Sequence, residues 1–99
     1  MIKVIALDDY VTDVLMRDLV GHDRAPSAFL VYLHLWAESE GRKRATVRAS
    51  HQTIAEAIGL SKSAVQKGVS HLLKRRLLKV HRDSVTATPE YRVQHPWRR

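Results

Sequence analysis

The sequence predicts an α+β domain that is mostly helical and carries a β-hairpin near its C-terminal end. Residues 50–78 show helical periodicity on both sides of a tight turn, and residues 26–38 show a further helical stripe. Residues 77–82 and 90–94 instead alternate between apolar and polar side chains, as half-buried strands do. The 99 residues are enough for one domain with a single modest core.

Residues 50–78 predict two short helices joined by a tight turn. Ser50 is suited to cap the first helix, because a serine hydroxyl accepts hydrogen bonds from the free amides at a helix start. The apolar stripe of this helix consists of Ile54, Ala55 and Ile58. Gly59 suits the left-handed residue that ends a helix, Leu60 fills the corner, and Ser61 can cap the next helix.

The second helix of this pair separates apolar from polar side chains. Its apolar side carries Val65, Val69, Leu72 and Leu73 at helical spacing. Its other sides carry hydroxyl, amide, imidazole and ammonium groups, contributed by Lys62, Ser63, Gln66, Lys67, Ser70, His71 and Lys74. We therefore expect one buried face and an opposite surface of hydrogen-bond donors and positive charge.

The helix pair resembles a bacterial helix-turn-helix, because five constrained positions stand at that family's spacing: Ala55, Ile58, Gly59, Leu60 and Val65. Since Leu77–Val80 follows directly, the chain more closely resembles the winged helix-turn-helix family, as in MarR- or GntR-type regulators and plasmid or phage replication initiators. The resemblance covers roughly residues 28–93. It implies a three-helix core plus a β-hairpin wing, here with an extra N-terminal strand or helix.

Two residues depart from the family pattern. Gly68 stands in mid-helix where the family usually has alanine, which costs up to ~1 kcal/mol of helix propensity. Arg76 stands where a glycine commonly ends the helix, so we expect this helix to close in some other way.

The chain divides into an N-terminal extension (residues 1–25), the winged-helix domain (26–94) and a tail (95–99). The first seven residues predict a short strand or an extended arm. Asp8 or Asp9 is placed to cap a first helix and to complement its dipole. The apolar stripe of that helix comprises Val11, Val14, Leu15 and Leu19. This stripe can complete the core or pair two protomers as a homodimer, and the sequence leaves both interpretations open.

Within the domain, Pro26 suits the first turn of a core helix that continues to about residue 38. The predicted core stripe of this helix is Phe29, Leu30, Leu33 and Trp36. Residues 45–49 predict a strand, and residues 83–89 predict the tip of the hairpin. A tight turn at Asp83-Ser84, with residues 85–88 as the return strand, is a competing interpretation that Pro89 makes less favoured. The inward side chains of the hairpin strands are predicted to be Leu78, Val80, Tyr91 and Val93. Trp97 in the tail either covers the edge of the core or belongs to a longer protein.

Charge is distributed unevenly along the chain. Residues 1–40 hold three basic and seven acidic groups, a balance of −4, whereas residues 41–99 hold fourteen basic and three acidic groups, a balance of +11. A solvated surface rich in basic residues would be enough to explain the net positive charge. Because the positive charge coincides with the helix pair, the pattern indicates a surface that binds a polyanion.

The resemblance implies which residues would contact DNA. In helix-turn-helix proteins the second helix enters the major groove with its N-terminal end, while the first helix crosses the backbone. Gln66 is the best candidate for reading a base, because an amide can pair with adenine through two hydrogen bonds. The full predicted DNA-binding set is Gln52, Thr53, Ser61, Lys62, Ser63, Gln66, Lys67, His71, Lys74 and, on the wing, Arg82.

Other classes of protein find little support. The chain has no cysteine, no glycine-rich phosphate loop and no GxSxG or HExxH motif, and its histidines lack metal-ligand spacing, so we expect no catalytic site, metal or cofactor. No apolar run is long enough to span a membrane, which indicates a cytoplasmic, nucleoid-associated protein. The favoured function is sequence-specific binding of double-stranded DNA by a transcriptional regulator. The alternatives are a replication-initiator module and a winged helix used for protein–protein docking.

Overall fold

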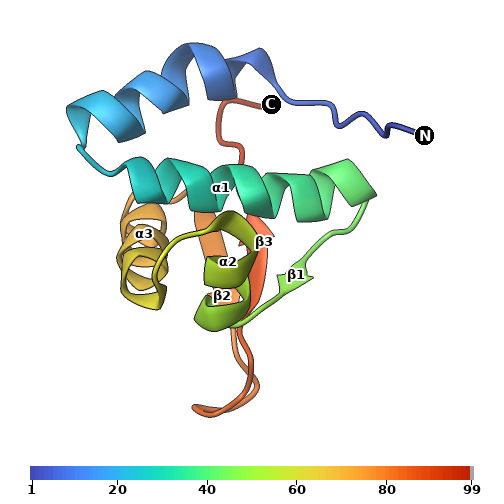
Figure 1. The fold of residues 1–99 in the computed structure, drawn as a ribbon, viewed down its shortest axis with the longest axis vertical. Helices are drawn as coiled ribbons and strands as arrows, with labels where there is room; N and C mark the ends of the chain where they lie inside the picture. Colours follow the sequence, from blue (N-terminus) through green and yellow to red (C-terminus); the bar gives the residue numbers. More distant parts are fainter. Residues whose placement is uncertain (99) are drawn as a thin grey trace.

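The computed structural model describes residues 1–98 and confirms an α+β architecture (Figure 1). An N-terminal helix made of two π-helical segments, Val11–Leu15 and Arg17–His22, comes first. The elements that follow are α1 (Pro26–Ser39), a 3₁₀ turn (Glu40–Arg42), β1 (Val47–Arg48), α2 (His51–Ile58), α3 (Lys62–Lys74), β2 (Leu78–His81) and β3 (Glu90–Val93). The three strands form one antiparallel sheet in the order β1-β3-β2.

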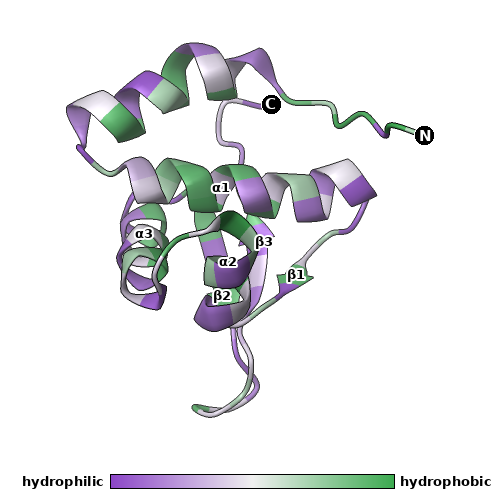
Figure 2. Ribbon diagram, in the orientation of Figure 1, coloured by the Kyte–Doolittle hydropathy of each residue, from purple (hydrophilic) through white to green (hydrophobic). Residues whose placement is uncertain are grey.

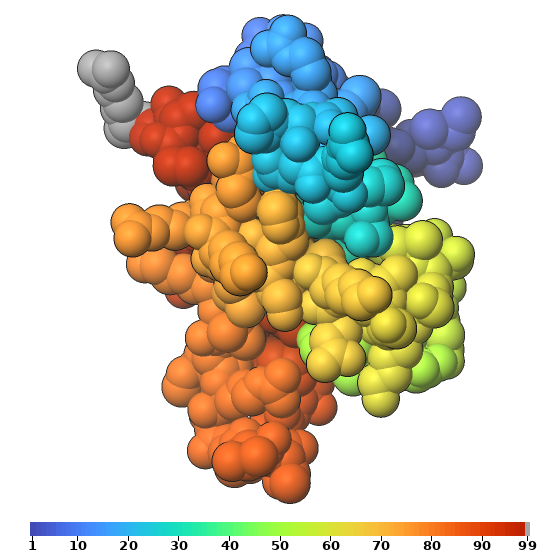
Figure 3. Space-filling model, turned by 90° about the vertical axis from the view of Figure 1, so that its left-hand side faces the viewer, coloured from blue at the N-terminus to red at the C-terminus, as the bar shows by residue number. Residues whose placement is uncertain are grey.

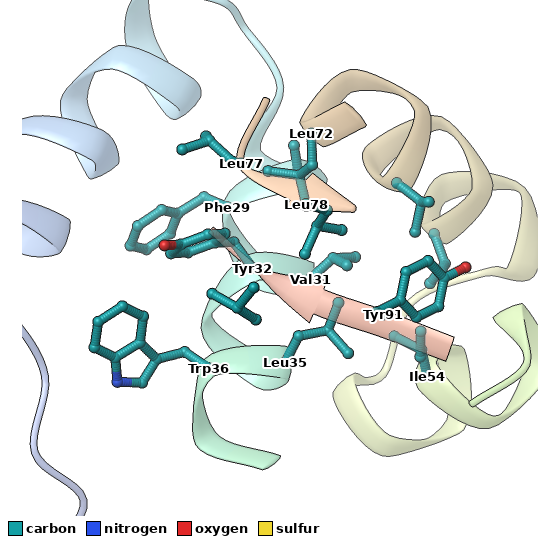
Figure 4. Packing of buried hydrophobic residues seen from close by; sticks show 14 of the residues in the cluster. Phe29, Val31, Tyr32, Leu35, Trp36, Ile54, Leu72, Leu77, Leu78 and Tyr91 are labelled. Carbon is teal, nitrogen blue, oxygen red and sulfur yellow. The ribbon is translucent and has the colours of Figure 1, made fainter. Parts of the chain in front are cut away.

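Helix α1 is the centre of the molecule and is covered on two sides. The N-terminal helix packs above it in Figure 1, and α2, α3 and the sheet pack below. Figure 4 shows Phe29 and Trp36 on one side of α1, with Ile54 and Tyr91 on the other. The buried residues of α1 are Ala28, Phe29, Val31, Tyr32, Leu35, Trp36 and Ser39.

This double coverage corrects the predicted stripe of α1. Leu30 was expected in the core, but its side chain is 42% exposed, and Leu33 is only partly buried. Val31 and Leu35 are fully buried instead. A helix with neighbours on two sides buries two separate stripes, and Leu30 lies between them.

The sheet places its apolar residues against the helices. Leu78, Tyr91 and Val93 are buried, as predicted, and the Tyr32 hydroxyl on α1 donates to the Gln94 carbonyl at the end of β3 over 2.7 Å. Val80 was also expected to point inward, but it is 41% exposed. Its strand, β2, is at the edge of the sheet, where nothing covers the side chain.

The N-terminal extension departs from one prediction. The first eight residues form an extended arm, which was one of the two predicted alternatives, and Figure 2 shows its mainly hydrophobic ribbon leading to the N-terminus. Ile2 and Val4 are largely exposed, whereas the Ala6 carbonyl accepts a hydrogen bond from Trp36 Nε1 over 2.9 Å. The first helix begins at Asp9, and the Asp8 carboxylate is bound by Trp97 and Arg98 and not by the first amides of the helix, so within residues 1–98 neither Asp8 nor Asp9 has the predicted capping role. The apolar stripe of this helix serves the core, because Val11, Leu15 and Leu19 are buried there; pairing of two protomers through this stripe is not supported.

The Asp8 carboxylate instead holds the C-terminal tail. It accepts hydrogen bonds from Trp97 Nε1 (2.8 Å) and from Arg98 Nε and Nη2 (2.7 and 2.9 Å). Trp97 in turn stacks on Tyr10 with ring centroids 4.5 Å apart, so the tail covers an edge of the core, which was one of the two predictions for Trp97. The hydrogen bonds from Arg98 and then Trp97 lower the pKa of Asp8 from 3.8 to about 2.

Replacing Asp8 by asparagine is expected to lower the free energy of unfolding at pH 7 by about 1–2 kcal/mol, allowing for partial solvent screening. A carboxyl group whose pKa is depressed in the folded state stabilises above pH 3.8, and this contribution is lost as the pH falls to about 2. Urea unfolding of Asp8→Asn and wild type should therefore converge between pH 4 and 2. Asp9→Asn is the control, and an equal effect of both substitutions would contradict this role.

Gly68 has a structural reason that the sequence did not show. It is buried in the middle of α3, where a Cβ atom would lie 3.2 Å from the backbone N and Cα of Ala28 on α1. The partners are backbone atoms and cannot move aside as a flexible side chain would. Glycine costs helix propensity at this position, but its lack of a Cβ atom permits a close crossing of α1 and α3, the two helices that pack most extensively on each other.

Gly68→Val is expected to lower the free energy of unfolding by about 2–3 kcal/mol, because the larger side chain must push α3 off α1. Gly21 offers a control, since a Cβ there would meet nothing within 4 Å. Gly21→Ala should leave stability unchanged or raise it by up to ~1 kcal/mol. Urea unfolding of both variants tests this, and a Gly68→Val protein as stable as wild type would refute the close crossing.

Candidate nucleic-acid interface

The junction between α2 and α3 has the local geometry that its residues predict. The Ser50 hydroxyl accepts from the amide of Thr53 and the Ser61 hydroxyl accepts from the amide of Ala64, each over 3.0 Å. Gly59 is left-handed with φ of 76°, and its amide bonds back to the Ala55 carbonyl. Two caps and one glycine thus hold the start of α3 in a defined direction.

The far end of α3 closes through a residue that was expected to prevent a left-handed cap. Arg76 itself adopts a left-handed conformation, with φ of 58°. The Leu77 amide bonds to the Leu72 carbonyl (2.9 Å) and the Arg76 amide to the Leu73 carbonyl (3.1 Å), which is the Schellman pattern. The expectation of a different closure was wrong, because Leu72 and Leu77 both enter the core and fix the chain there.

Arg76→Gly is expected to stabilise the protein by about 1 kcal/mol, because glycine adopts the left-handed region without the strain of a side chain. Lys74→Gly removes the same charge from inside α3 and should destabilise by about 1 kcal/mol. Thermal unfolding of the two variants distinguishes these effects. A loss of stability in both would show that Arg76 is not strained.

The polar side of α3 is fully accessible. Ser61, Lys62, Ser63, Gln66, Lys67 and Lys74 are exposed, whereas Val65, Val69 and Leu72 on the opposite side are buried. A shallow hollow of about 440 Å³ runs along this surface, lined by Ser63, Gln66, Lys67, Ser70, His71 and Lys74. Figure 3 shows α3 across the middle of this side of the molecule, with the β2–β3 loop projecting below it.

A second hollow, of about 240 Å³, joins α2, α3 and the β2–β3 loop (residues 82–89). Its lining includes His51, Lys62 and Arg82, so three basic side chains from three elements meet there. Partial burial, followed by the charges of Arg82 and Lys62, lowers the pKa of His51 below its usual 6.5. The sequence did not indicate that residues 86–89 of the loop would line the same hollow.

The predicted residues Gln52 and Thr53 lie exposed at the start of α2. Gln52 Nε2 donates to Glu56 Oε1 over 2.9 Å, and the Thr53 hydroxyl is 2.9 Å from the Ser50 hydroxyl. Both side chains therefore make local contacts while they remain accessible from outside.

His71 on α3 is bound by Asp23 of the N-terminal extension, a contact that the sequence did not predict. Its Nε2 lies 2.7 Å from Asp23 Oδ2, and Arg75 Nε lies 3.1 Å from the same oxygen. Hydrogen bonds from His22 and His71 hold the pKa of Asp23 below 3.8. Asp23 thus ties the C-terminal half of α3 to the N-terminal extension, and one nitrogen of His71 is not free for a ligand. The separation of 48 residues left no local signal for this contact.

The basic residues differ in whether a carboxylate neutralises them. Arg42, Arg48, Arg75 and Arg98 form salt bridges. Within residues 1–98, no salt bridge involves Lys62, Lys67, Lys74 or Arg82 on the side of α3, nor Lys43, Arg44, Lys79 or Arg92 near the sheet. These eight residues fall into two groups. Four further basic residues of this part of the chain form no salt bridge and lie outside both groups: Lys3, Arg17, Arg24 and Arg76.

Comparisons of the chain with protein-family models, curated proteins and solved structures find no match. In the part of the chain that the structure describes, no group of three histidine, aspartate or glutamate side chains is arranged to hold a metal ion. None of the helices in residues 1–98 has the length and apolar character that crossing a membrane requires.

Proposed function

We propose that the chain is a winged helix-turn-helix domain that binds double-stranded DNA sequence-specifically, with α3 in the major groove, as a transcriptional regulator. The observation that carries the proposal is the exposed side of α3. There, Lys62, Lys67 and Lys74 have no carboxylate partner within residues 1–98 and flank the hydrogen-bonding group of Gln66. Cations left without partners along one helix suit the phosphates on both edges of a DNA groove.

The arrangement of the elements supports the same proposal. A strand precedes the helix pair, two strands follow it, and the first strand pairs with the last in the sheet order β1-β3-β2. On this proposal α1, α2 and α3 are the three-helix core and residues 82–89 are the wing. The wing and the start of α3 share the hollow that contains Lys62 and Arg82.

The side chains divide into two roles on this proposal. Gln66 reads a base edge, with Ser61 and Ser63 beside it, because amide and hydroxyl groups can donate and accept. Lys62, Lys67 and Lys74 contact phosphates, and Arg82 with His51 holds the backbone where the wing meets α2. His71 supports α3 through Asp23 and extends the hollow beside Lys74. The role is binding and requires no catalytic group.

Fluorescence anisotropy with duplex DNA, at salt concentrations between 50 and 200 mM, tests this function. The preferred sequence comes from selection in a randomised duplex pool. Lys67→Ala should weaken binding to every duplex and reduce the salt slope by about 0.9, as loss of one phosphate contact does. Gln66→Ala should blur the preference at one base pair, a discrimination of about 1–3 kcal/mol.

Lys3→Ala is the matched control, because Lys3 lies in the exposed arm at the other end of the chain. It should change neither the salt slope nor the sequence preference. Binding that is absent for all duplexes, or insensitive to salt, would contradict the proposed function. Equal effects of Lys67→Ala and Lys3→Ala would contradict the assignment to α3.

A further inference from the structure

The outer face of the sheet carries a pair of like charges. Lys79 on β2 lies directly opposite Arg92 on β3 in the strand register, and both side chains are exposed. Like charges directly opposite each other on one face of a sheet are destabilising. Stability of the hairpin therefore does not explain this pair.

The charges on the same face nearer the wing are neutralised. Arg48 Nη2 lies 3.2 Å from Glu90 Oε2, and His81 Nε2 lies 3.1 Å from Asp83 Oδ1. In the sheet register both Arg48 and His81 are partners of Glu90. Within the paired residues of the three strands, Lys79 and Arg92 are the basic side chains that form no salt bridge in residues 1–98, and they lie at the end of the sheet away from the wing.

A hollow beside this pair adds further cations. It has a volume of about 500 Å³ and is lined by Lys43, Arg44 and Arg92, together with Gln94 and His95. The carboxylate in its wall, Glu40, is already engaged by Arg98 (3.2 Å) and His95 (3.0 Å). Lys43 is held in a left-handed turn that ends the 3₁₀ segment, which brings its residue to the rim of this hollow.

This surface is separate from the polar side of α3. The two hollows share no lining residue, and both α3 and the sheet turn their apolar sides into one core through Val65, Val69, Tyr91 and Val93. The polar side of α3 and the polar side of the sheet therefore both face away from this core and belong to different elements. In Figure 1, α3 lies at the left of the body, whereas β2 and β3 run behind α2.

We propose that the outer face of the sheet at Lys79 and Arg92, together with Lys43 and Arg44 in the adjoining hollow, binds the phosphate backbone of a second DNA duplex, so that one domain holds two segments together. The inference rests on the proposed function, because α3 holds the first duplex. Two arginines and two lysines without carboxylate partners in residues 1–98 complement closely spaced phosphates. Contacts to phosphates alone choose no sequence, so this second site accepts any duplex.

A two-duplex capture assay tests the inference. A biotin-labelled duplex with the preferred sequence is immobilised, the protein is added, and retention of a fluorescent duplex of unrelated sequence is measured. Wild type should retain the second duplex. Lys79→Glu with Arg92→Glu should reduce this retention at least tenfold while the affinity for the immobilised duplex changes less than threefold. Lys79→Gln with Arg92→Gln, which removes the charge without inverting it, should give an intermediate loss.

Lys3→Glu with Arg17→Glu is the control of equal charge change, because both residues are exposed and lie on the N-terminal extension. It should retain the second duplex as wild type does. Equal loss in both double variants would overturn the inference, as would a wild type that binds the first duplex and captures no second one. A protein that binds no first duplex instead refutes the proposed function.

The alternative occupant of this face is the acidic N-terminal extension of a second copy of the chain. Sedimentation of the same proteins distinguishes this alternative from a second duplex. The inference predicts a monomer whose mass is unchanged by the substitutions at Lys79 and Arg92. A dimer that dissociates in this variant would overturn the inference, because the sheet face would then bind protein.

Discussion

The close contact between α1 and α3 is the constraint on which the rest of the structure depends. At Gly68 the two helices approach so closely that a Cβ atom would lie 3.2 Å from backbone atoms of Ala28. One side of α3 is therefore fully used, with Val65 and Leu72 inaccessible to solvent. On the opposite side Ser61, Lys62, Ser63, Gln66, Lys67 and Lys74 are exposed, and their hydroxyl, amide and ammonium groups are available to a partner.

The direction of α3 is fixed at both ends as well as along its length. Ser61 caps its start after the left-handed Gly59, and the strained Arg76 closes its end over Leu72 and Leu77. Asp23 adds a charged contact through His71 and Arg75. A helix held in this way loses little further freedom when it binds, which favours affinity and a defined position of Gln66.

The acidic extension serves the fold and reduces its own negative field. Asp8 is neutralised by Arg98, and Asp23 by His71 and Arg75, while the ion pair of Glu38 and Arg42 uses a further carboxylate. Among the carboxylates of residues 41–98, Asp83 and Glu90 are engaged by Arg48 and His81, whereas Glu56 accepts a hydrogen bond from Gln52. Positive charge without a carboxylate partner in residues 1–98 remains on α3 and at one end of the sheet.

Local features could be predicted from the sequence, because their causes lie within a few residues. Ser50 and Ser61 cap the helices that follow them, and Gly59 ends α2 in a left-handed conformation. The separation of α3 into a buried and an exposed side follows from the periodicity of its apolar residues. Contacts between distant residues could not be predicted. Trp97 lies 89 residues from Asp8, and no sequence pattern near either residue predicts their hydrogen bond.

Burial was misjudged where it depends on what covers an element. Leu30 follows helical spacing but lies between the two covered sides of α1, and Val80 alternates correctly but stands on an edge strand. The residues proposed for the DNA interface were found through chemical type and spacing on α3. The group at Lys79 and Arg92 was missed, since only the pairing of β2 with β3 brings these two residues together.

Backbone amide chemical-shift mapping by NMR during titration with a duplex tests the central claim most directly. The account predicts that the largest shifts occur at residues 61–67 and in the wing at residues 82–88, with little change at residues 9–20 of the N-terminal helix. Shifts centred on the N-terminal helix, or none at the start of α3 under conditions where the duplex binds, would contradict it.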